Sequence, residues 1–232
     1  GRWQGARRRN AARLERLERV HALERERARI ARDIHDDLGS GLTRIMLLSE
    51  SARSELPPAS AAAADVDSIR RAADDLTRAM DEIVWAVDPR HDSLDSLVGY
   101  IGSTAQEFLK TANLRFRLEA PDHPPAWPLT AECRHSLFLA FREALHNVIR
   151  HAQAQTVRVV FAVETSAFSL TIEDDGRGFD PAATVSRPGG GRGLHHMQDR
   201  LAELGGTCHL TSLPGQGTRV TFRLPVTASP LS

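Results

Sequence analysis

A seven-residue apolar repeat fills the first part of the chain and ends at two prolines. Its apolar residues recur at three- and four-residue steps: Leu14, Leu17, Val20, Leu23, Ile30, Ile34, Leu38, Leu42, Ile45 and Leu48. Arg27 occupies the position of the repeat between Leu23 and Ile30. This spacing predicts one amphipathic helix from about residue 7 to residue 53. Pro57 and Pro58 must end it, because proline has no N–H to donate to the helical ladder.

A second helix is expected after the prolines. Ser60 or a neighbour can cap it, and its apolar positions are Val66, Ile69, Ala73, Leu76, Met80, Ile83 and Val84. The pattern breaks at Trp85, and residues 85–92 mark a domain boundary. The result is a helical hairpin with one apolar stripe on each helix. Two stripes close a core poorly, whereas two hairpins can form a four-helix bundle, so we expect a homodimer.

Helical and strand patterns alternate after this boundary. Ser93 can cap a helix over 94–110, and a proline-rich turn occupies 121–128. Further helices are predicted over 132–150 and 194–204, and strands over 114–118, 156–162, 167–173, 207–212 and 219–224. This order predicts a helix layer on a mixed sheet, an α/β sandwich, so the fold class of the whole chain is α+β.

Composition narrows the possible partners and compartments. The 30 basic and 30 acidic residues balance, so nothing favours nucleic acid as a direct partner. Cys133 and Cys208 lie far apart without metal-site spacing, which indicates structural roles in a reducing compartment. No apolar run of about 18 residues is present, so we expect no membrane-spanning segment. The chain opens inside a charged helix, so we expect a missing upstream sensor or membrane domain.

His35 lies at the edge of the first apolar stripe and is followed by Asp36. A carboxylate beside an imidazole can orient the ring and accept its proton while the other nitrogen acts as a nucleophile. Taken alone, this stretch is better explained as a surface histidine in a charged helix, because acidic neighbours are common there.

Four later segments are typical of nucleotide chemistry when they occur together. Glu143 and Asn147 are four residues apart on one helical face, where the Asn oxygen could ligate Mg²⁺; solvated surface positions are the alternative. The others are the turn Asp174-Asp175-Gly176-Arg177-Gly178 after a strand, the run Gly189-Gly190-Gly191-Arg192-Gly193-Leu194 opening a helix, and Gly217-Thr218 after a hairpin turn. Glycines at a helix start let the backbone wrap phosphates, although each segment alone is also an ordinary turn or flexible loop.

In this order the segments resemble the transmitter region of a bacterial sensor histidine kinase over about residues 20–225. The resemblance is to the subfamily whose response regulators have helix-turn-helix output domains. The phosphoacceptor box matches Arg29 to Gly39, and Ile83 to Pro89 resembles the subfamily's connecting segment. The second domain resembles the ATPase fold of histidine kinases, DNA gyrase, Hsp90 and MutL. Its N box matches Glu143 to Asn147 with His151 just after, and its glycine boxes match the glycine segments above.

The resemblance implies a mechanism and a set of site residues. His35 would be autophosphorylated from Mg-ATP, with Asp36 and Glu143 as catalytic partners, and the phosphoryl group would pass to an Asp of a response regulator receiver domain. Asn147 would hold Mg²⁺ and Asp174 would bind adenine. A lid over about 180–192 would close on the phosphates. The remaining nucleotide-binding positions would be His151, Gly176, Gly178, Gly191, Gly193, Leu194 and Thr218.

The implied domain order is a coiled-coil signalling helix (1–25), a dimerisation and phosphotransfer domain (26–90), an ATP-binding domain (91–227) and a tail (228–232). The chain would be the cytoplasmic portion of a membrane-tethered sensor. Ser40 stands where the subfamily often has a Gln that positions water for phosphatase activity, which puts that activity in doubt. Asp33, in place of the usual Glu, is a mild change. Two alternatives are a serine kinase of anti-sigma type and a nucleotide-binding dimerisation scaffold.

Overall fold

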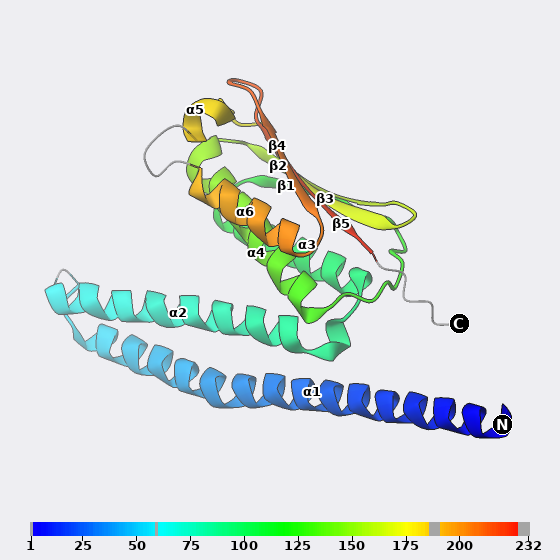
Figure 1. Ribbon diagram of the computed structural model, residues 1–232. Helices are drawn as coiled ribbons and strands as arrows, with labels where there is room; N and C mark the ends of the chain where they lie inside the picture. The colour runs from blue at the N-terminus through cyan, green and yellow to red at the C-terminus, as the bar shows by residue number, and fades with distance from the viewer. Residues whose placement is uncertain (1, 59, 186–190, 227–232) are drawn as a thin grey trace. The chain divides into compact units, whose positions relative to one another are not determined.

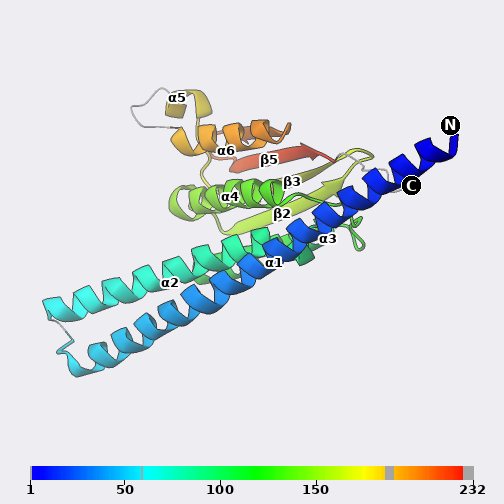
Figure 2. The same cartoon turned by 60° about the horizontal axis from the view of Figure 1, so that its bottom comes forward.

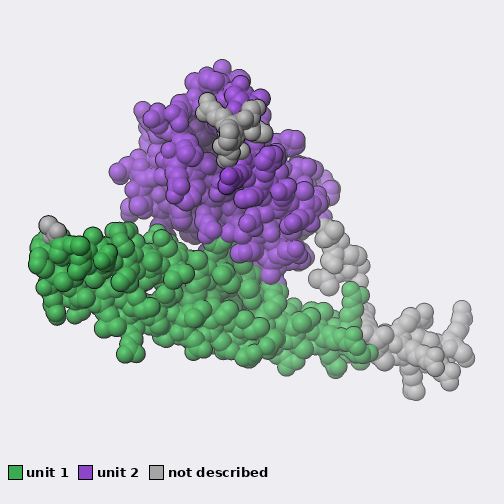
Figure 3. Space-filling model, turned by 60° about the vertical axis from the view of Figure 1, so that its left-hand side comes forward, with its two compact units in different colours: residues 1–91 green, residues 92–232 purple. Residues whose placement is uncertain are grey.

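The computed structural model describes residues 2–58, 60–185 and 191–226, with side chains for all of these except 2–13, 184 and 185. It divides into two compact units, residues 1–91 and 92–232, which are coloured separately in Figure 3. Each unit has its own set of elements and is described by itself.

The first unit is a helical hairpin, as predicted (Figures 1 and 2). Helix α1 spans Arg2–Glu55 and ends just before the two prolines, and α2 spans Ala61–Val87. The Ser60 side chain accepts a hydrogen bond from Ala63 N and caps α2. Small residues fill the seam between the helices, since Ala31, Ala63 and Ala73 are buried. The hairpin therefore closes tightly on small side chains.

The second helix is longer than predicted. The expectation that the helix breaks at Trp85 is wrong, because α2 continues through Val87 and Asp88 N donates to Val84 O to complete its last turn. Trp85 and Ala86 are buried, so continuing the helix keeps both apolar side chains from water. A short 3₁₀ turn, η1 (Pro89–His91), follows.

The second unit is a five-stranded mixed sheet with helices on one face (Figures 1 and 2). The strand order is β1-β2-β3-β5-β4, with β1 parallel to β2 and the other pairs antiparallel. The strands are β1 (Arg115–Glu119), β2 (Thr156–Val163), β3 (Ala167–Asp174), β4 (Thr207–Ser212) and β5 (Thr218–Pro225). All lie within two residues of the predicted ranges.

Three long helices cover the sheet: α3 (Leu94–Thr111), α4 (Ala131–Asn147) and α6 (Arg192–Glu203). Alternate residues of β2 and β3, including Val157, Val159 and Leu170, point into this core and are fully buried. Ser93 caps α3 as predicted. The predicted α/β sandwich is confirmed.

Two local features differ from prediction. The helix expected to reach Arg150 ends at Asn147 and continues as a π-helical turn over Val148–Ala152, which Gln153 closes in the left-handed conformation. Apolar periodicity could not distinguish this turn from α-helix, because Val148 and Ile149 continue the same pattern. A short helix, α5 (Pro181–Val185), was not predicted.

Candidate active site

Distant segments meet at one end of the sheet in the second unit. Helix α4 carries Glu143, β3 ends at Asp174, and β5 begins at Thr218. The contacts between segments are very close: a Cβ added to Gly193 would lie 2.1 Å from Glu143 Oε1, and one added to Gly217 would lie 2.0 Å from Asp174 O. The structure therefore joins the four segments that the sequence singled out in two pairs, the first with the third and the second with the fourth.

Glu143 and Asn147 lie one turn apart on the same face of α4, as their spacing predicts. Asn147 Nδ2 donates to Glu143 Oε1 at 3.5 Å. This bond leaves Asn147 Oδ1 as an oxygen ligand, which suits Mg²⁺ because that ion takes few protein groups and keeps phosphate and water ligands. Among the described residues, no group of three or more His, Cys, Asp or Glu could hold a metal ion alone. The donor set thus fits Mg²⁺ that arrives with phosphate.

The Asp174 carboxylate is half-buried at the end of β3. Its Oδ1 accepts a hydrogen bond from Gly176 N at 2.9 Å. Burial raises the pKa of Asp174, and the N–H groups of Gly176 and Thr218 only partly offset that rise. A half-buried carboxylate in this position can accept a hydrogen bond from the amino group of a planar ligand.

The loop after Asp174 is held by contacts that admit only glycine. A Cβ on Gly176 would lie 2.3 Å from Ala152 O, at the end of the π-helical turn. Gly178 has φ +57°, and a Cβ there would lie 2.0 Å from Leu213 O. The His151 side chain is exposed, and its carbonyl accepts a hydrogen bond from Arg177 Nε at 2.8 Å. His151 therefore supports this loop through its backbone.

Ser212 is a site residue that sequence reasoning missed. Its hydroxyl lies 3.0 Å from Thr218 Oγ1, donates to Gly217 O at 2.9 Å and accepts from Phe179 N at 2.9 Å. It is buried and links the first glycine loop to the β4–β5 hairpin. The available signal was its register opposite Thr218, which needs the strand pairing and not the sequence alone.

The second glycine segment is described only in part. Gly191 adopts the left-handed conformation with φ +74° and begins α6, and Leu194 is half-buried in that helix's first turn. Gly189 and Gly190, with the rest of residues 186–190, lie outside the described residues. Of the expected lid over 180–192, the structure describes residues 180–185, which include α5, and residues 191 and 192 at the start of α6.

His35 lies on α1 in the first unit, and its side chain is 63% exposed. Its Nδ1 is 3.5 Å from Asp36 Oδ1, so the two side chains are neighbours as predicted. Ser40 Oγ donates back to Asp37 O at 3.1 Å, which keeps this hydroxyl against its own helix. The helix therefore presents an accessible imidazole beside a carboxylate.

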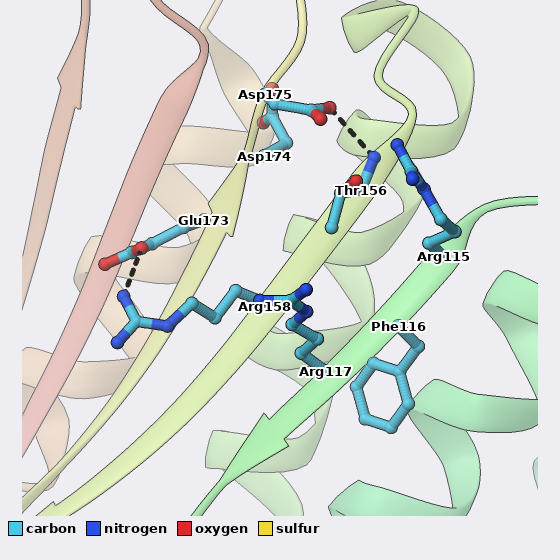
Figure 4. Close-up of a pocket in the computed structure, with 8 residues that line it drawn as sticks. All are labelled: Arg115, Phe116, Arg117, Thr156, Arg158, Glu173, Asp174 and Asp175. Carbon is cyan, nitrogen blue, oxygen red and sulfur yellow. Dashed lines mark hydrogen bonds and ion pairs between the residues drawn. The ribbon is translucent and has the colours of Figure 1, made fainter.

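The uncovered face of the sheet carries a hollow of about 650 Å³, shown in Figure 4. Arg115 and Arg117 of β1 and Arg158 of β2 line it together with Glu173 and Asp175. Arg158 is bonded to Glu119 and Glu173, and Asp175 Oδ1 accepts from Thr156 N at 2.9 Å. The Arg158 ion pairs form a charged network on this surface of the sheet, and we assign the hollow no ligand.

Two protein-family models match the chain in the order of its units. The model described as "Histidine kinase" matches residues 26–92, and the one described as "Histidine kinase-, DNA gyrase B-, and HSP90-like ATPase" matches residues 133–228. The chain belongs to the sensor histidine kinase family. The first match contains His35, and the second contains Glu143, Asp174, Gly193 and Thr218.

Curated relatives agree with this assignment. The chain is 30% identical over 212 residues to sensor histidine kinase DesK of Bacillus subtilis strain 168, and the match covers 91% of this chain and 54% of DesK. It is 25% identical over 204 residues to LiaS of the same strain, covering 87% and 54%. It is 26% identical over 205 residues to sensor protein VraS of Staphylococcus aureus strain COL, covering 88% and 56%. The chain thus spans about half the length of these relatives.

Solved structures share the fold. The Erythrobacter litoralis EL346 blue-light activated histidine kinase aligns with a TM-score of 0.54 and 20% identity over 88% of this chain and 61% of that one. Full-length ShkA in complex with AMPPNP aligns with a TM-score of 0.53 and 15% identity over 89% and 47%. A helical hairpin followed by an α/β ATPase domain is therefore the histidine kinase fold. Within the described part of the kinase, no helix is both long and apolar enough to cross a membrane.

Proposed function

We propose that this chain is the catalytic core of a sensor histidine kinase, which phosphorylates its own His35 from Mg-ATP and passes the phosphoryl group to an Asp of a response regulator receiver domain. The observation that supports this best is a pair of contacts between the predicted segments, Glu143 with Gly193 and Asp174 with the Thr218 N–H. The exposed His35–Asp36 pair supplies the acceptor.

In this proposal the site residues mainly bind and orient the nucleotide. Asp174 accepts from the adenine amino group, the backbone around Gly191 and Gly193 lies along the phosphates, and Asn147 Oδ1 holds Mg²⁺. Glu143 supports Asn147 or a metal-bound water. Mg²⁺ supplies charge neutralisation at the phosphate oxygens. Such positioning and neutralisation are the main contributions a protein makes to phosphoryl transfer.

The acceptor step uses the two ring nitrogens of His35 differently. Nδ1 faces Asp36 Oδ1, so its proton passes to that carboxylate. Nε2 attacks the γ-phosphorus, the bond from that phosphorus to the bridging oxygen breaks, and ADP leaves. The receiver Asp then takes the phosphoryl group and His35 is restored. Because Ser40 stands where the subfamily often has a water-positioning Gln, the proposal is limited to kinase activity.

The proposal includes a homodimer. Ile69, Leu76 and Ile83 follow one another at seven-residue steps along α2 and are 52%, 59% and 45% exposed in the single hairpin. Leu38 and Leu48 of α1 are likewise exposed. A second hairpin would cover these stripes and form a four-helix bundle.

Incubation with labelled ATP tests the function. The expected product is an acid-labile, base-stable phosphate that is absent in His35→Gln. An acid-stable label would favour a serine kinase of anti-sigma type, and ATP binding without incorporation would favour a dimerisation scaffold. Either result would contradict the proposal.

A further inference from the structure

One hydrogen bond joins the upstream part of α1 to the far end of α2. Arg27 Nε donates to Val87 O at 3.0 Å across 60 residues of sequence, and Arg27 is partly buried. Val87 is the last residue of α2, so its carbonyl is one of the four at a helix C-terminus that lack an intrahelical partner. A guanidinium at this end also complements the helix dipole.

Arg27 interrupts an otherwise apolar repeat. Leu23 precedes it and Ile30 follows it in the stripe of α1. Upstream of Arg27, Leu14, Leu17, Val20 and Leu23 are all exposed. Arg27 therefore lies on α1 opposite the last residue of α2. An apolar side chain at this position could not donate a hydrogen bond to the Val87 carbonyl.

The segment after Val87 is held firmly to the end of α2. Asp88 is buried, and its carboxylate accepts from Arg90 N and Arg90 Nε at 2.9 Å. The Arg90 hydrogen bonds also hold the pKa of Asp88 below its usual range. The Trp85 and His91 rings stack with centroids 5.8 Å apart. Residues 85–91 therefore form one stiff turn whose position follows that of Val87.

We infer that Arg27 is a positioning residue: it fastens the end of α2, and with it the segment leading into the ATP-binding domain, to the upstream part of α1. The effect of Arg27 on phosphorylation rests on the proposed function. A rotation of α1 that withdraws the guanidinium would release this turn. Signals arriving along α1 would then reach the connecting segment through the Arg27 side chain.

Hydrogen exchange of residues 84–91 in the whole chain tests this inference without using activity. In Arg27→Met, the amides of Asp88 and His91 should exchange about tenfold faster, as expected for losing a hydrogen bond from a charged donor. The matched control is Arg25→Met, because Arg25 Nε donates to His21 O within its own helix. That variant should exchange at the wild-type rate. Equal exchange in Arg27→Met and wild type would overturn the inference.

Arg27→Lys keeps the positive charge and an N–H donor, but its side chain has a different length and geometry. In this variant the amides of Asp88 and His91 should exchange at a rate between those of wild type and Arg27→Met. If the hairpin of Arg27→Met fails to fold, as judged by exchange in the parts of α1 and α2 away from this turn, the comparison of Arg27→Lys with wild type decides. Lysine at the wild-type rate would then count against the inference.

Autophosphorylation gives a second readout. Loosening the turn lets the segment that leads into the ATP-binding domain adopt more conformations, so in Arg27→Met kcat should fall several-fold while the KM for ATP stays constant. An unchanged kcat would contradict the positioning role. Failure of the wild type to take label would instead contradict the proposed function, and the exchange result would still stand.

Discussion

The Glu143 carboxylate lies directly against the α-carbon of Gly193. A Cβ built on Gly193 would stand 2.1 Å from Glu143 Oε1, so an alanine there would require the Glu143 side chain to move. This contact joins α4 to the first turn of α6 and brings the helix start next to the Glu143–Asn147 face. The absence of a side chain at Gly193 therefore leaves room for the Glu143 carboxylate beside the first turn of α6.

Gly193→Ala should weaken ATP binding. The new methyl group must displace Glu143, and through the Asn147–Glu143 hydrogen bond it should disturb the proposed metal ligand. We expect at least about a tenfold loss of affinity, or 1.4 kcal/mol, measured by titration calorimetry.

Gly99→Ala is the control for that substitution. Gly99 lies in α3, and nothing lies within 4 Å of a Cβ added there. Its ATP affinity should be unchanged, and its free energy of unfolding should rise by about 0.5–1 kcal/mol, because alanine favours a helix interior over glycine. Equal ATP affinity in Gly193→Ala and Gly99→Ala would contradict the assigned role of Gly193.

Leu76→Glu should dissociate the proposed dimer. Leu76 is 59% exposed in one hairpin, and a symmetric bundle would bury two copies of it. Losing two buried leucines at about 1.5–3 kcal/mol each should raise the dimer Kd at least a hundredfold. Sedimentation velocity measures the shift to monomer.

The matched control is Leu213→Glu, since Leu213 is 58% exposed and lies in the β4–β5 turn of the second unit, outside the helical stripes of the hairpin sequence. It should leave the sedimentation coefficient unchanged. A wild-type chain that sediments as a monomer at every concentration would rule out the homodimer.

His135 should make the second unit less stable in mild acid. Burial lowers its pKa, with smaller contributions from Arg200 and Arg142. Among the described side chains, its buried Nδ1 has no hydrogen-bond partner. As the pH falls below about 6.5, His135 becomes protonated in the unfolded chain but stays neutral in the folded chain. The free energy of unfolding therefore falls until the pH reaches the folded-state pKa.

Melting temperatures at pH 7.5 and 5.5 check this sign. The wild type should lose more stability between the two values than His135→Met, which has no titrating group at this position. An equal loss in both proteins would show that other groups account for the acid sensitivity.

Much of this fold could be predicted because its boundaries depend on local chemistry. Pro57 and Pro58 end α1, and the Ser60 and Ser93 side chains begin α2 and α3. The strands have alternating side chains, and their predicted ranges are correct to within two residues. The glycine segments were recognisable from their order and spacing in the sequence, and at Gly176, Gly178 and Gly217 close contacts with backbone atoms explain why glycine is needed.

Features that depend on long-range partners could not be predicted. Arg134 sits in an amphipathic helix and is fully buried, because Asp92, 42 residues earlier, pairs with it. Ser212 gains its role only when β4 pairs with β5. Helix α2 continues through Trp85 because the Trp85 and Ala86 side chains are buried. The sequence did not indicate this burial, and the Asp88-Pro89 pair suggested an earlier end to the helix.

Phosphate labelling of His35 tests the central claim most directly. Wild type, His35→Gln and His21→Gln are incubated with labelled Mg-ATP, and the product is challenged with acid and with base. His21 is the matched control, because it is an exposed histidine on the same helix with Nδ1 3.3 Å from Glu24 Oε2. We predict acid-labile, base-stable label in wild type and His21→Gln and none in His35→Gln. Undiminished label in His35→Gln would contradict the account.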